Sequence, residues 1–453
     1  MPTADLVVQG SRVVTPEGMR PAAVVIAGGL IADVVAPGVA PEALRRVDAG
    51  DLVVLPGLVD AHVHLNEPGR AEWEGFESGT RAAAAGGVTT VVDMPLNSVP
   101  VTTTVAALEA KARAAAGRAT TDYALWGGVV PGNERELAGL VRAGAPGCKC
   151  FLVPSGIDEF PAVTAADLRP AMQRLAELGA VLLVHAELPG PIDRARAGGD
   201  GRRYASYLAS RPPQAEHEAI ALVLELCRAT GCAVHVVHLS SAGALDALAR
   251  ARASGLPVTV ETCPHYLTFA AEQIADGATA FKCAPPIREG ENRERLWDGL
   301  ASGIIDFVAS DHSPAPPALK RLESGDFLTA WGGIASLELL LAATWTAARA
   351  RGHGPEQLAR WLAAGPARLA GIGNRKGRIA PGCDADLVIW DPEPTLTVDP
   401  TRLHHRHPIT PYAESRLSGV VLQTFLRGTC VYERGRFLGG PGGQWIRRGG
   451  MSA

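Results

Sequence analysis

Val181-Leu-Leu-Val-His185 is a short apolar stretch that ends in a histidine. A segment rich in alanine, leucine and glutamate with helical spacing follows at 215–229, and a second apolar stretch, Ala233-Val-His-Val-Val-His238, comes next. An apolar strand, a helix and another apolar strand in this order predict a unit whose two strands lie parallel in one sheet.

The same alternation extends outward in both directions over about 315 residues, with a further clear helical segment at 332–348. A doubly wound open sheet is the competing architecture, but no Gly-x-Gly-x-x-Gly opens the helix after the first strand. The sequence therefore predicts an α/β fold, a (β/α)8 TIM-like barrel. The eight strands are expected to begin near Leu58, Val88, Asp122, Gly147, Val181, Ala233, Val258 and Ile304.

Both ends of the chain have short strand-like runs separated by turns, such as Ala23-Val-Val-Ile26 and Ala385-Asp-Leu-Val-Ile-Trp390. Each end is too small to bury a core alone, so we expect the two to form one small β-sandwich domain. The predicted division is 1–55 and 375–453 for this domain and its tail, and 56–374 for the barrel.

Composition narrows the class of protein. The chain has 453 residues, 43 basic and 47 acidic side chains and a net charge of −4, which disfavours nucleic acid and anionic membranes as partners. It contains no apolar run of about 18 residues and no secretory signal pattern at its start. Eight cysteines without a Cys-x-x-Cys pair are typical of cytosolic thiols, so we expect a cytoplasmic protein.

The ends of the predicted barrel strands carry candidate metal ligands. His62 and His64 are two apart and therefore face the same side of an extended strand. Two imidazoles at a barrel mouth suit a divalent metal, although two hydrogen-bonded histidines are the alternative.

Other strand ends strengthen the metal interpretation. His185 and His238 each end an apolar strand, and Asp311 reaches the same level on the last strand. His235, three residues before His238, faces the opposite side and is expected to be a packed, hydrogen-bonded core histidine.

Lys149 lies between two cysteines in the apolar strand Gly147-Cys-Lys-Cys-Phe151, and the chain has only five lysines. Burial lowers the pKa of a lysine and frees its amine, which can add carbon dioxide to give an anionic carbamate. A solvent-seeking lysine or a simple ion pair is the alternative. Cys148 and Cys150 face away from Lys149 and are expected to be small buried apolar side chains.

Several further stretches accompany these residues. They are, in chain order, Pro56-Gly-Leu-Val-Asp-Ala-His-Val-His-Leu-Asn-Glu-Pro-Gly-Arg70, Asp93-Met-Pro-Leu-Asn97, Gly147-Cys-Lys-Cys-Phe151, Val184-His-Ala-Glu187, His235-Val-Val-His-Leu-Ser-Ser241, Glu261-Thr-Cys-Pro-His-Tyr266, Lys282-Cys-Ala-Pro-Pro-Ile-Arg288, Ser310-Asp-His-Ser-Pro314 and Lys376-Gly-Arg-Ile-Ala-Pro-Gly-Cys-Asp-Ala-Asp386.

In this order, and over nearly the whole chain, the set resembles the cyclic amidohydrolases of the amidohydrolase superfamily, and among them most closely the allantoinases. The resemblance implies metal-dependent hydrolysis of the cyclic amide of allantoin to allantoate, a step of purine breakdown. It also implies a homo-oligomer, often a tetramer, with a small molecule as the substrate.

The resemblance further implies two divalent metal ions, with zinc the first expectation and cobalt, manganese or iron as alternatives. His62, His64 and Asp311 would hold one ion, and His185 and His238 the other. Lys149, carboxylated by carbon dioxide to N6-carboxylysine, would bridge them together with a hydroxide. Asp311 would act as the catalytic general base and then as the acid.

The expected substrate contacts are Asn66, Asn97 and Ser313. The resembling dihydroorotases have an arginine two residues after the second histidine to bind a carboxylate, and here that position is Asn66. An asparagine suits an uncharged ureido group better, because its amide both donates and accepts. Arg70 remains a possible replacement for that arginine, and Ala284 stands where relatives often have a polar residue.

Dihydroorotase, a hydantoinase or dihydropyrimidinase, and a metal-free structural relative are the alternative functions. The metal-free relative is disfavoured because all six expected ligand positions hold competent residues.

Other polar residues are expected to be structural. His265 is interpreted as a hydrogen-bonded loop anchor and the histidines at 404, 405 and 407 as a solvated surface turn. Trp126 and Trp331 are expected to pack loops near the pocket, and Glu67 and Arg70 either form the pocket or pair with each other.

Overall fold

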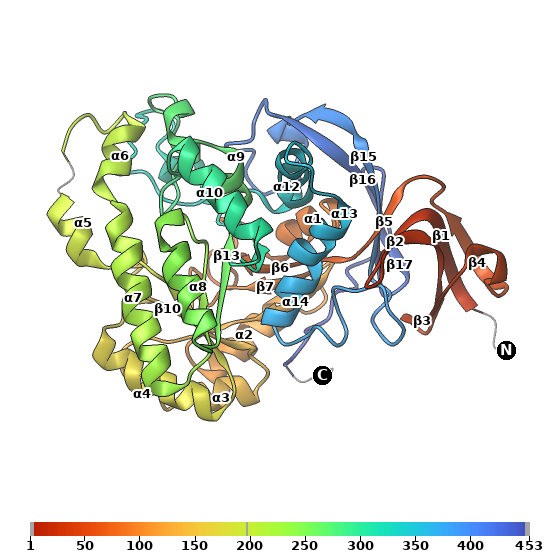
Figure 1. Ribbon diagram of the computed structural model, residues 1–453, viewed down its shortest axis with the longest axis horizontal. Helices are drawn as coiled ribbons and strands as arrows, with labels where there is room; N and C mark the ends of the chain where they lie inside the picture. The colour runs from red at the N-terminus through yellow and green to blue at the C-terminus, as the bar shows by residue number, and fades with distance from the viewer. Residues whose placement is uncertain (1–3, 196–197, 449–453) are drawn as a thin grey trace.

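The computed structural model of the chain describes residues 4–195 and 198–448. Figure 1 shows a barrel covered by helices, with a β-sheet domain packed beside it. The two ends of the chain build the sheet domain and the middle builds the barrel.

The barrel contains the eight predicted parallel strands. They start within about three residues of their predicted positions, and the last one is only two residues long. Their bounds are β6 (Leu58–Val63), β7 (Val88–Asp93), β8 (Asp122–Leu125), β10 (Gly147–Phe151), β11 (Val181–His185), β12 (Val234–Val236), β13 (Val258–Thr262) and β14 (Phe307–Val308).

These strands form two parallel sheets that close into a ring. One sheet has the order β6-β7-β8, and the other has the order β14-β13-β12-β11-β10-β9, where β9 (Gly127–Gly128) directly follows β8 in the chain. A parallel bridge between Val63 and His312 joins β6 to the end of the last strand. The predicted α/β barrel is therefore confirmed.

Helices follow the strands and cover the outside of the barrel (Figure 1). The helix predicted at 215–229 is α7, but the segment predicted at 332–348 becomes helical only at Leu340, after a 3-10 turn at Leu337–Leu339. The helices are α1 (Phe76–Ala85), α2 (Val105–Ala115), α3 (Leu137–Arg142), α4 (Ala165–Glu177), α5 (Pro189–Ala195), α6 (Tyr204–Ser210), α7 (Pro213–Thr230), α8 (Leu245–Ala253), α9 (Pro264–Thr268), α10 (Gly290–Ala301), α11 (Pro317–Lys320), α12 (Leu340–Arg349), α13 (Pro355–Ala359) and α14 (Gly365–Leu369).

The interior of the barrel is a packed core. Val92, Leu183 and Phe307 point inward from three strands, and Ala367 and Ile372, in and just after α14, belong to the same buried cluster. Filling the interior with apolar side chains excludes water from the strand ends above it, which is where barrel enzymes place their chemistry.

The small domain is one nine-stranded sheet with the strand order β18-β17-β16-β15-β5-β1-β2-β3, and β4 pairs with β1. Strand β5, from the N-terminal segment, pairs antiparallel with β15, so the two chain ends form one β domain, as predicted, and they do so within a single sheet. The bounds are β1 (Ala4–Thr15), β2 (Gly18–Ala27), β3 (Leu30–Val35), β4 (Ala43–Asp48), β5 (Val53–Pro56), β15 (Leu387–Thr397), β16 (Arg416–Leu426), β17 (Thr429–Glu433) and β18 (Arg436–Phe437).

A buried cluster of charges joins the small domain to the barrel. The Lys376 ammonium lies 2.6 Å from Asp122, the first residue of β8, and 2.8 and 2.7 Å from Asp384 and Asp386. Arg427 also pairs with Asp122. Removing this ammonium would leave the buried carboxylate of Asp386 without a cation and would take one of two cations from Asp122 and Asp384, so Lys376 stabilises the joint.

None of the helices in the described part of the chain combines the length and the hydropathy that a membrane crossing requires.

Candidate active site

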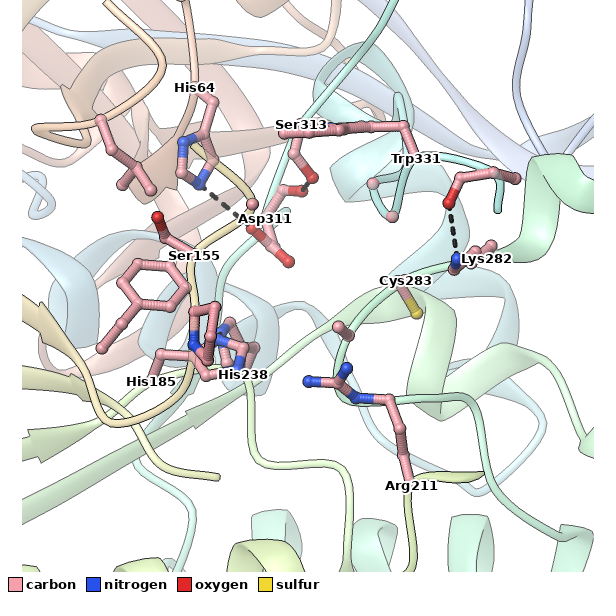
Figure 2. Close-up of a pocket in the computed structure, with 18 of the residues that line it drawn as sticks. His64, Ser155, His185, Arg211, His238, Lys282, Cys283, Asp311, Ser313 and Trp331 are labelled. Atoms are coloured by element: carbon pink, nitrogen blue, oxygen red, sulfur yellow. Dashed lines mark hydrogen bonds and ion pairs between the residues drawn. The ribbon is translucent and has the colours of Figure 1, made fainter. Parts of the chain in front are cut away.

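The six predicted metal ligands line one cavity at the carboxyl ends of the barrel strands, and Figure 2 shows His64, His185, His238 and Asp311 around it. Each is at most 6% exposed to solvent. The structure therefore brings together side chains that are up to 249 residues apart in the chain. The six are His62, His64, Lys149, His185, His238 and Asp311.

One group of donor atoms converges on Asp311. The Nε2 atoms of His62 and His64 lie 3.2 and 3.6 Å from Asp311 Oδ1. Burial raises the pKa of Asp311, but the neighbouring imidazoles outweigh burial and hold it far below its usual range. Asp311 is therefore a carboxylate at neutral pH, as a metal ligand must be.

A second group consists of His185 and His238. His185 Nδ1 lies 3.0 Å from His238 Nε2. Burial lowers the pKa of both imidazoles, so both are neutral and each offers a lone pair. Two neutral imidazole nitrogens that face one point form a donor pair that suits a divalent transition metal.

Lys149 lies in the middle of β10 and lines the same cavity. Burial lowers its pKa to about 8, although the nearby carboxylates of Glu261 and Asp311 raise it. Its Nζ lies 5.0 Å from the centre of the Phe151 ring. Among the residues described, this ammonium has no hydrogen bond or ion pair, so the nearby carboxylates offset its burial only in part.

The donor set fits a divalent metal centre. Three buried ligands of the His62 group lie within 4.8 Å of one another, and two further imidazoles and an unpaired lysine complete the rim. Imidazole and carboxylate donors in this combination are typical of zinc, iron, cobalt and manganese sites.

The backbone is strained at this site. Asn66, Asn97, His238 and Asp311 have φ values of +64°, +65°, +40° and +45°. Such left-handed conformations cost about 1–3 kcal/mol for residues other than glycine, and they gather where the surrounding structure fixes a functional side chain.

Glu261, at the end of β13, holds His62 in place, and it escaped the sequence analysis. Its Oε1 lies 2.5 Å from His62 Nδ1, and its Oε2 lies 3.0 Å from His235 Nε2. His235 Nδ1 in turn lies 2.8 Å from the Thr259 hydroxyl. His235 is thus a buried, hydrogen-bonded core histidine, as expected. It also fixes the position of the Glu261 carboxylate, which contacts His62.

Glu187 and Arg211 form a second support that the sequence analysis missed. Glu187 Oε2 lies 2.8 Å from His185 Nε2, and Arg211 binds both oxygens of the same carboxylate. The position of Glu187 two residues after a strand-end histidine could have indicated it, because a metal-binding imidazole commonly donates its other nitrogen to a carboxylate.

The cavity has a volume of about 440 Å³. Asn97 and Ser313 line it, whereas Asn66 does not, although both polar atoms of the buried Asn66 amide lack partners among the described residues. Ser313 Oγ donates to the carbonyl of Asp311. A Cβ on Gly333 would lie 2.1 Å from the Ser313 carbonyl, so this wall requires a glycine.

Arg70 and Glu67 do not pair with each other. Arg70 donates to the Asn97 carbonyl and pairs with Glu159, and Glu67 pairs with Arg118. Arg70 is not among the residues that line the cavity, so it does not replace the missing arginine of dihydroorotases.

Two histidine expectations are wrong. His265 is fully buried, but neither ring nitrogen has a hydrogen-bond partner among the described residues, so it is not a hydrogen-bonded anchor. His405 is only 7% exposed and its ring packs 4.9 Å from that of His312. The segment around it is therefore not a solvated turn, because it packs against the barrel.

The two tryptophans have different surroundings. Trp331 lines the cavity and packs edge-on against Trp73. Trp126 instead lies in the barrel interior, where its indole N–H donates to the Ala61 carbonyl. The expectation of loop packing near the pocket therefore fits Trp331 but not Trp126.

Comparison with known proteins agrees with this fold and donor set. The model of the amidohydrolase family matches residues 53–431. A metal-binding barrel hydrolase is the class of protein that the architecture and the strand-end side chains define, and the chain belongs to the amidohydrolase family.

Among the individual relatives of this chain are allantoinases and a hydantoinase of known structure. An allantoinase of Streptomyces avermitilis is 51% identical over 449 residues, which cover 99% of this chain and all of the relative. An allantoinase of Arabidopsis thaliana is 44% identical over 447 residues, 95% of this chain and 88% of the relative. Among solved structures, the L-hydantoinase of Arthrobacter aurescens superposes with a TM-score of 0.93 at 34% identity, covering 98% of this chain and all of that one.

Proposed function

We propose that the protein hydrolyses the ring amide of allantoin, giving allantoate. The observation that carries the proposal is the pair of donor groups around one cavity, in a chain that matches allantoinases over nearly its full length. The reaction is the opening of a cyclic amide, which is the chemistry of the family.

The residues proposed to hold two divalent metal ions are those of the two donor groups: His62, His64 and Asp311 for one ion, and His185 and His238 for the other. Zinc is the first candidate, and cobalt, manganese and iron accept the same donors. Such ions polarise the scissile carbonyl and lower the pKa of a water molecule.

We propose that Lys149 is carboxylated. Its neutral amine adds carbon dioxide to form a C–N bond, and one proton is released to solvent, leaving a carbamate whose single negative charge is shared by its two oxygens. The buried position and the lowered pKa of Lys149 support this modification, because a neutral amine is the reactive form. A carbamate would supply the anionic ligand that the two donor groups share.

Asp311 is proposed as the catalytic proton carrier. It accepts a proton from the attacking water and delivers it to the departing ring nitrogen. The attacked carbon is the ring carbonyl next to the carbon that bears the ureido arm. The carboxylate of the product forms there, and the opened ring becomes a second ureido group.

Substrate contacts are proposed for Asn97 and Ser313, which line the cavity. Asn66 is retained as a proposed contact because its buried amide lacks partners among the described residues.

The eight cysteines form no disulfide, which supports the proposed cytoplasmic location. A homotetramer is proposed from the resemblance to cyclic amidohydrolases, and the division at residues 55 and 374 is proposed from the strand pattern of the two chain ends.

A hydantoinase is the second candidate function, favoured by the close superposition on the Arthrobacter enzyme. Purified protein loaded separately with zinc, manganese or cobalt should be assayed with allantoin, hydantoin and dihydroorotate. The proposal expects the highest kcat/KM on allantoin. Higher efficiency on hydantoin or dihydroorotate would reject it in favour of the corresponding alternative.

A further inference from the structure

A buried ion pair connects the second donor group to the far side of the cavity. Glu187 is fully buried and lies two residues after His185 at the end of β11. It contacts His185 Nε2 through Oε2 and receives the Arg211 guanidinium in a two-bonded pair, Nε to Oε1 at 3.1 Å and Nη2 to Oε2 at 2.7 Å. One carboxylate therefore sets the positions of both an imidazole and a guanidinium.

The backbone of Arg211 is fixed as well. Arg211 comes directly after α6, and it is followed by Pro212 and by Pro213, the first residue of α7. Its carbonyl accepts a hydrogen bond from Arg288, which is held by the buried Glu216. The guanidinium is thus anchored from both ends and has little freedom to turn away from the cavity.

The third nitrogen of this guanidinium is free for a ligand. Arg211 lines the cavity, and Figure 2 shows its guanidinium directed toward the open space on the side away from His64. The pair with Glu187 uses Nε and Nη2, and in the described parts of the chain Nη1 makes no hydrogen bond.

The other cation on this side of the cavity is already engaged. The Lys282 ammonium donates to the carbonyls of Leu328 and Ala330 and lies 5.0 Å from the centre of the Tyr207 ring. It therefore holds the cavity wall in place. Arg211 is the cation on this side that retains a donor directed at the cavity.

We propose that Arg211 is a specificity-determining residue whose Nη1 donates a hydrogen bond to the carbonyl oxygen of the exocyclic ureido arm of the substrate. The inference rests on the proposed function. When the ring carbonyl faces the histidine groups, the arm on the neighbouring carbon extends across the cavity, and a fixed charged donor opposite recognises its oxygen. A hydantoin without the arm has no group for this donor.

The test compares substrates with and without the arm in Arg211→Lys, which keeps a cation beside Glu187 but lacks the forked donor. We expect kcat/KM for allantoin to fall ten- to a hundredfold, while kcat/KM for hydantoin changes less than threefold. If the wild type does not turn over hydantoin, the inhibition constant of hydantoin against allantoin hydrolysis replaces kcat/KM as the measure for a ligand without the arm. Arg211→Met removes the donor and also leaves the buried Glu187 carboxylate without its cation, so it should lower kcat/KM for both substrates and reduce the bound metal.

Glu187→Gln provides the contrast, because it loosens His185 as well as Arg211. It should lower efficiency on both substrates and reduce the bound metal, measured by elemental analysis, whereas Arg211→Lys should retain metal. An equal loss on both substrates in Arg211→Lys, or no loss on either, would overturn the assignment. A wild-type protein without activity on allantoin would instead reject the proposed function, and this inference with it.

Discussion

Glu261→Gln is the substitution that tests most directly how the site is held. Glu261 accepts hydrogen bonds from two imidazoles, His62 Nδ1 at 2.5 Å and His235 Nε2 at 3.0 Å, and a longer one from the backbone N–H of His238 at 3.3 Å. A glutamine has one acceptor and one donor at the same positions. One of the two histidines must therefore lose its N–H partner or change its tautomer.

The magnitude follows from that exchange. A hydrogen bond to a buried charged group contributes about 1.5–3 kcal/mol, so losing one should lower the free energy of unfolding by a similar amount. If His62 changes tautomer, its Nε2 carries the proton and loses the lone pair that faces Asp311. Removing a carboxylate that supports a metal-binding histidine typically costs about 10–100-fold in metal affinity.

The assay is a chelator titration of metal-loaded protein, combined with urea unfolding. His235→Gln is the matched control, because it changes the other partner of Glu261 and leaves the contact with His62 in place. We expect weakened metal binding in Glu261→Gln, and mainly a loss of stability in His235→Gln. Wild-type metal affinity in Glu261→Gln would refute the claim that this carboxylate orients His62.

The remaining predictions concern the ligands, the substrate and the domain joint. Lys149→Ala should lose most bound metal and nearly all turnover, measured by elemental analysis and a rate assay, with partial rescue by small carboxylic acids; wild-type turnover would end the carbamate proposal. Asp311→Asn should lower turnover by several orders of magnitude while the fold, followed by circular dichroism, is retained. Efficiency on allantoin should exceed that on dihydroorotate at least a hundredfold, about 2.7 kcal/mol, because Arg70 is held by Asn97 and Glu159. Lys376→Met should cost about 3–5 kcal/mol of stability at neutral pH. The carboxylates around Lys376 outweigh its burial and raise its pKa. The stability difference should therefore persist from neutral pH up to about pH 10.4, the pKa of a lysine in the unfolded chain, and shrink above it. A difference that disappears between neutral pH and that value would contradict the role of the cluster.

The barrel could be predicted from the sequence because its signal is local. Each strand is a short apolar run, and a polar residue at its end is visible without knowing any neighbour. Strand β14 shows the limit, since only Phe307–Val308 pairs as a strand, although the apolar pattern begins at Ile304. Pairing depends on the neighbouring strand, which the local pattern does not specify.

The candidate metal ligands could be named for the same reason, but their supporting partners could not. Glu261 is 199 residues from His62, and its role depends on β13 pairing with β12 so that Thr259 lies opposite His235. Likewise, the burial of His405 depends on a segment after β15 packing against the barrel. Such contacts arise only when strand register and domain packing are fixed.

The strained backbone and the buried charges at the strand ends cost stability, which the rest of the molecule must offset. His238 and Asp311 are held in left-handed conformations, which point their side chains into the cavity while the chain turns outward. Each conformation costs about 1–3 kcal/mol, and the burial of Glu187 and Glu261 adds a cost that only their hydrogen bonds offset. Interior residues such as Val92 and Leu183, and the Lys376 cluster, do not line the cavity and supply stability away from the substrate. Substitutions in these two regions should therefore change stability with little effect on selectivity. Substitutions at Glu187 or Glu261 should instead weaken metal binding, and Arg211→Lys should change substrate selectivity.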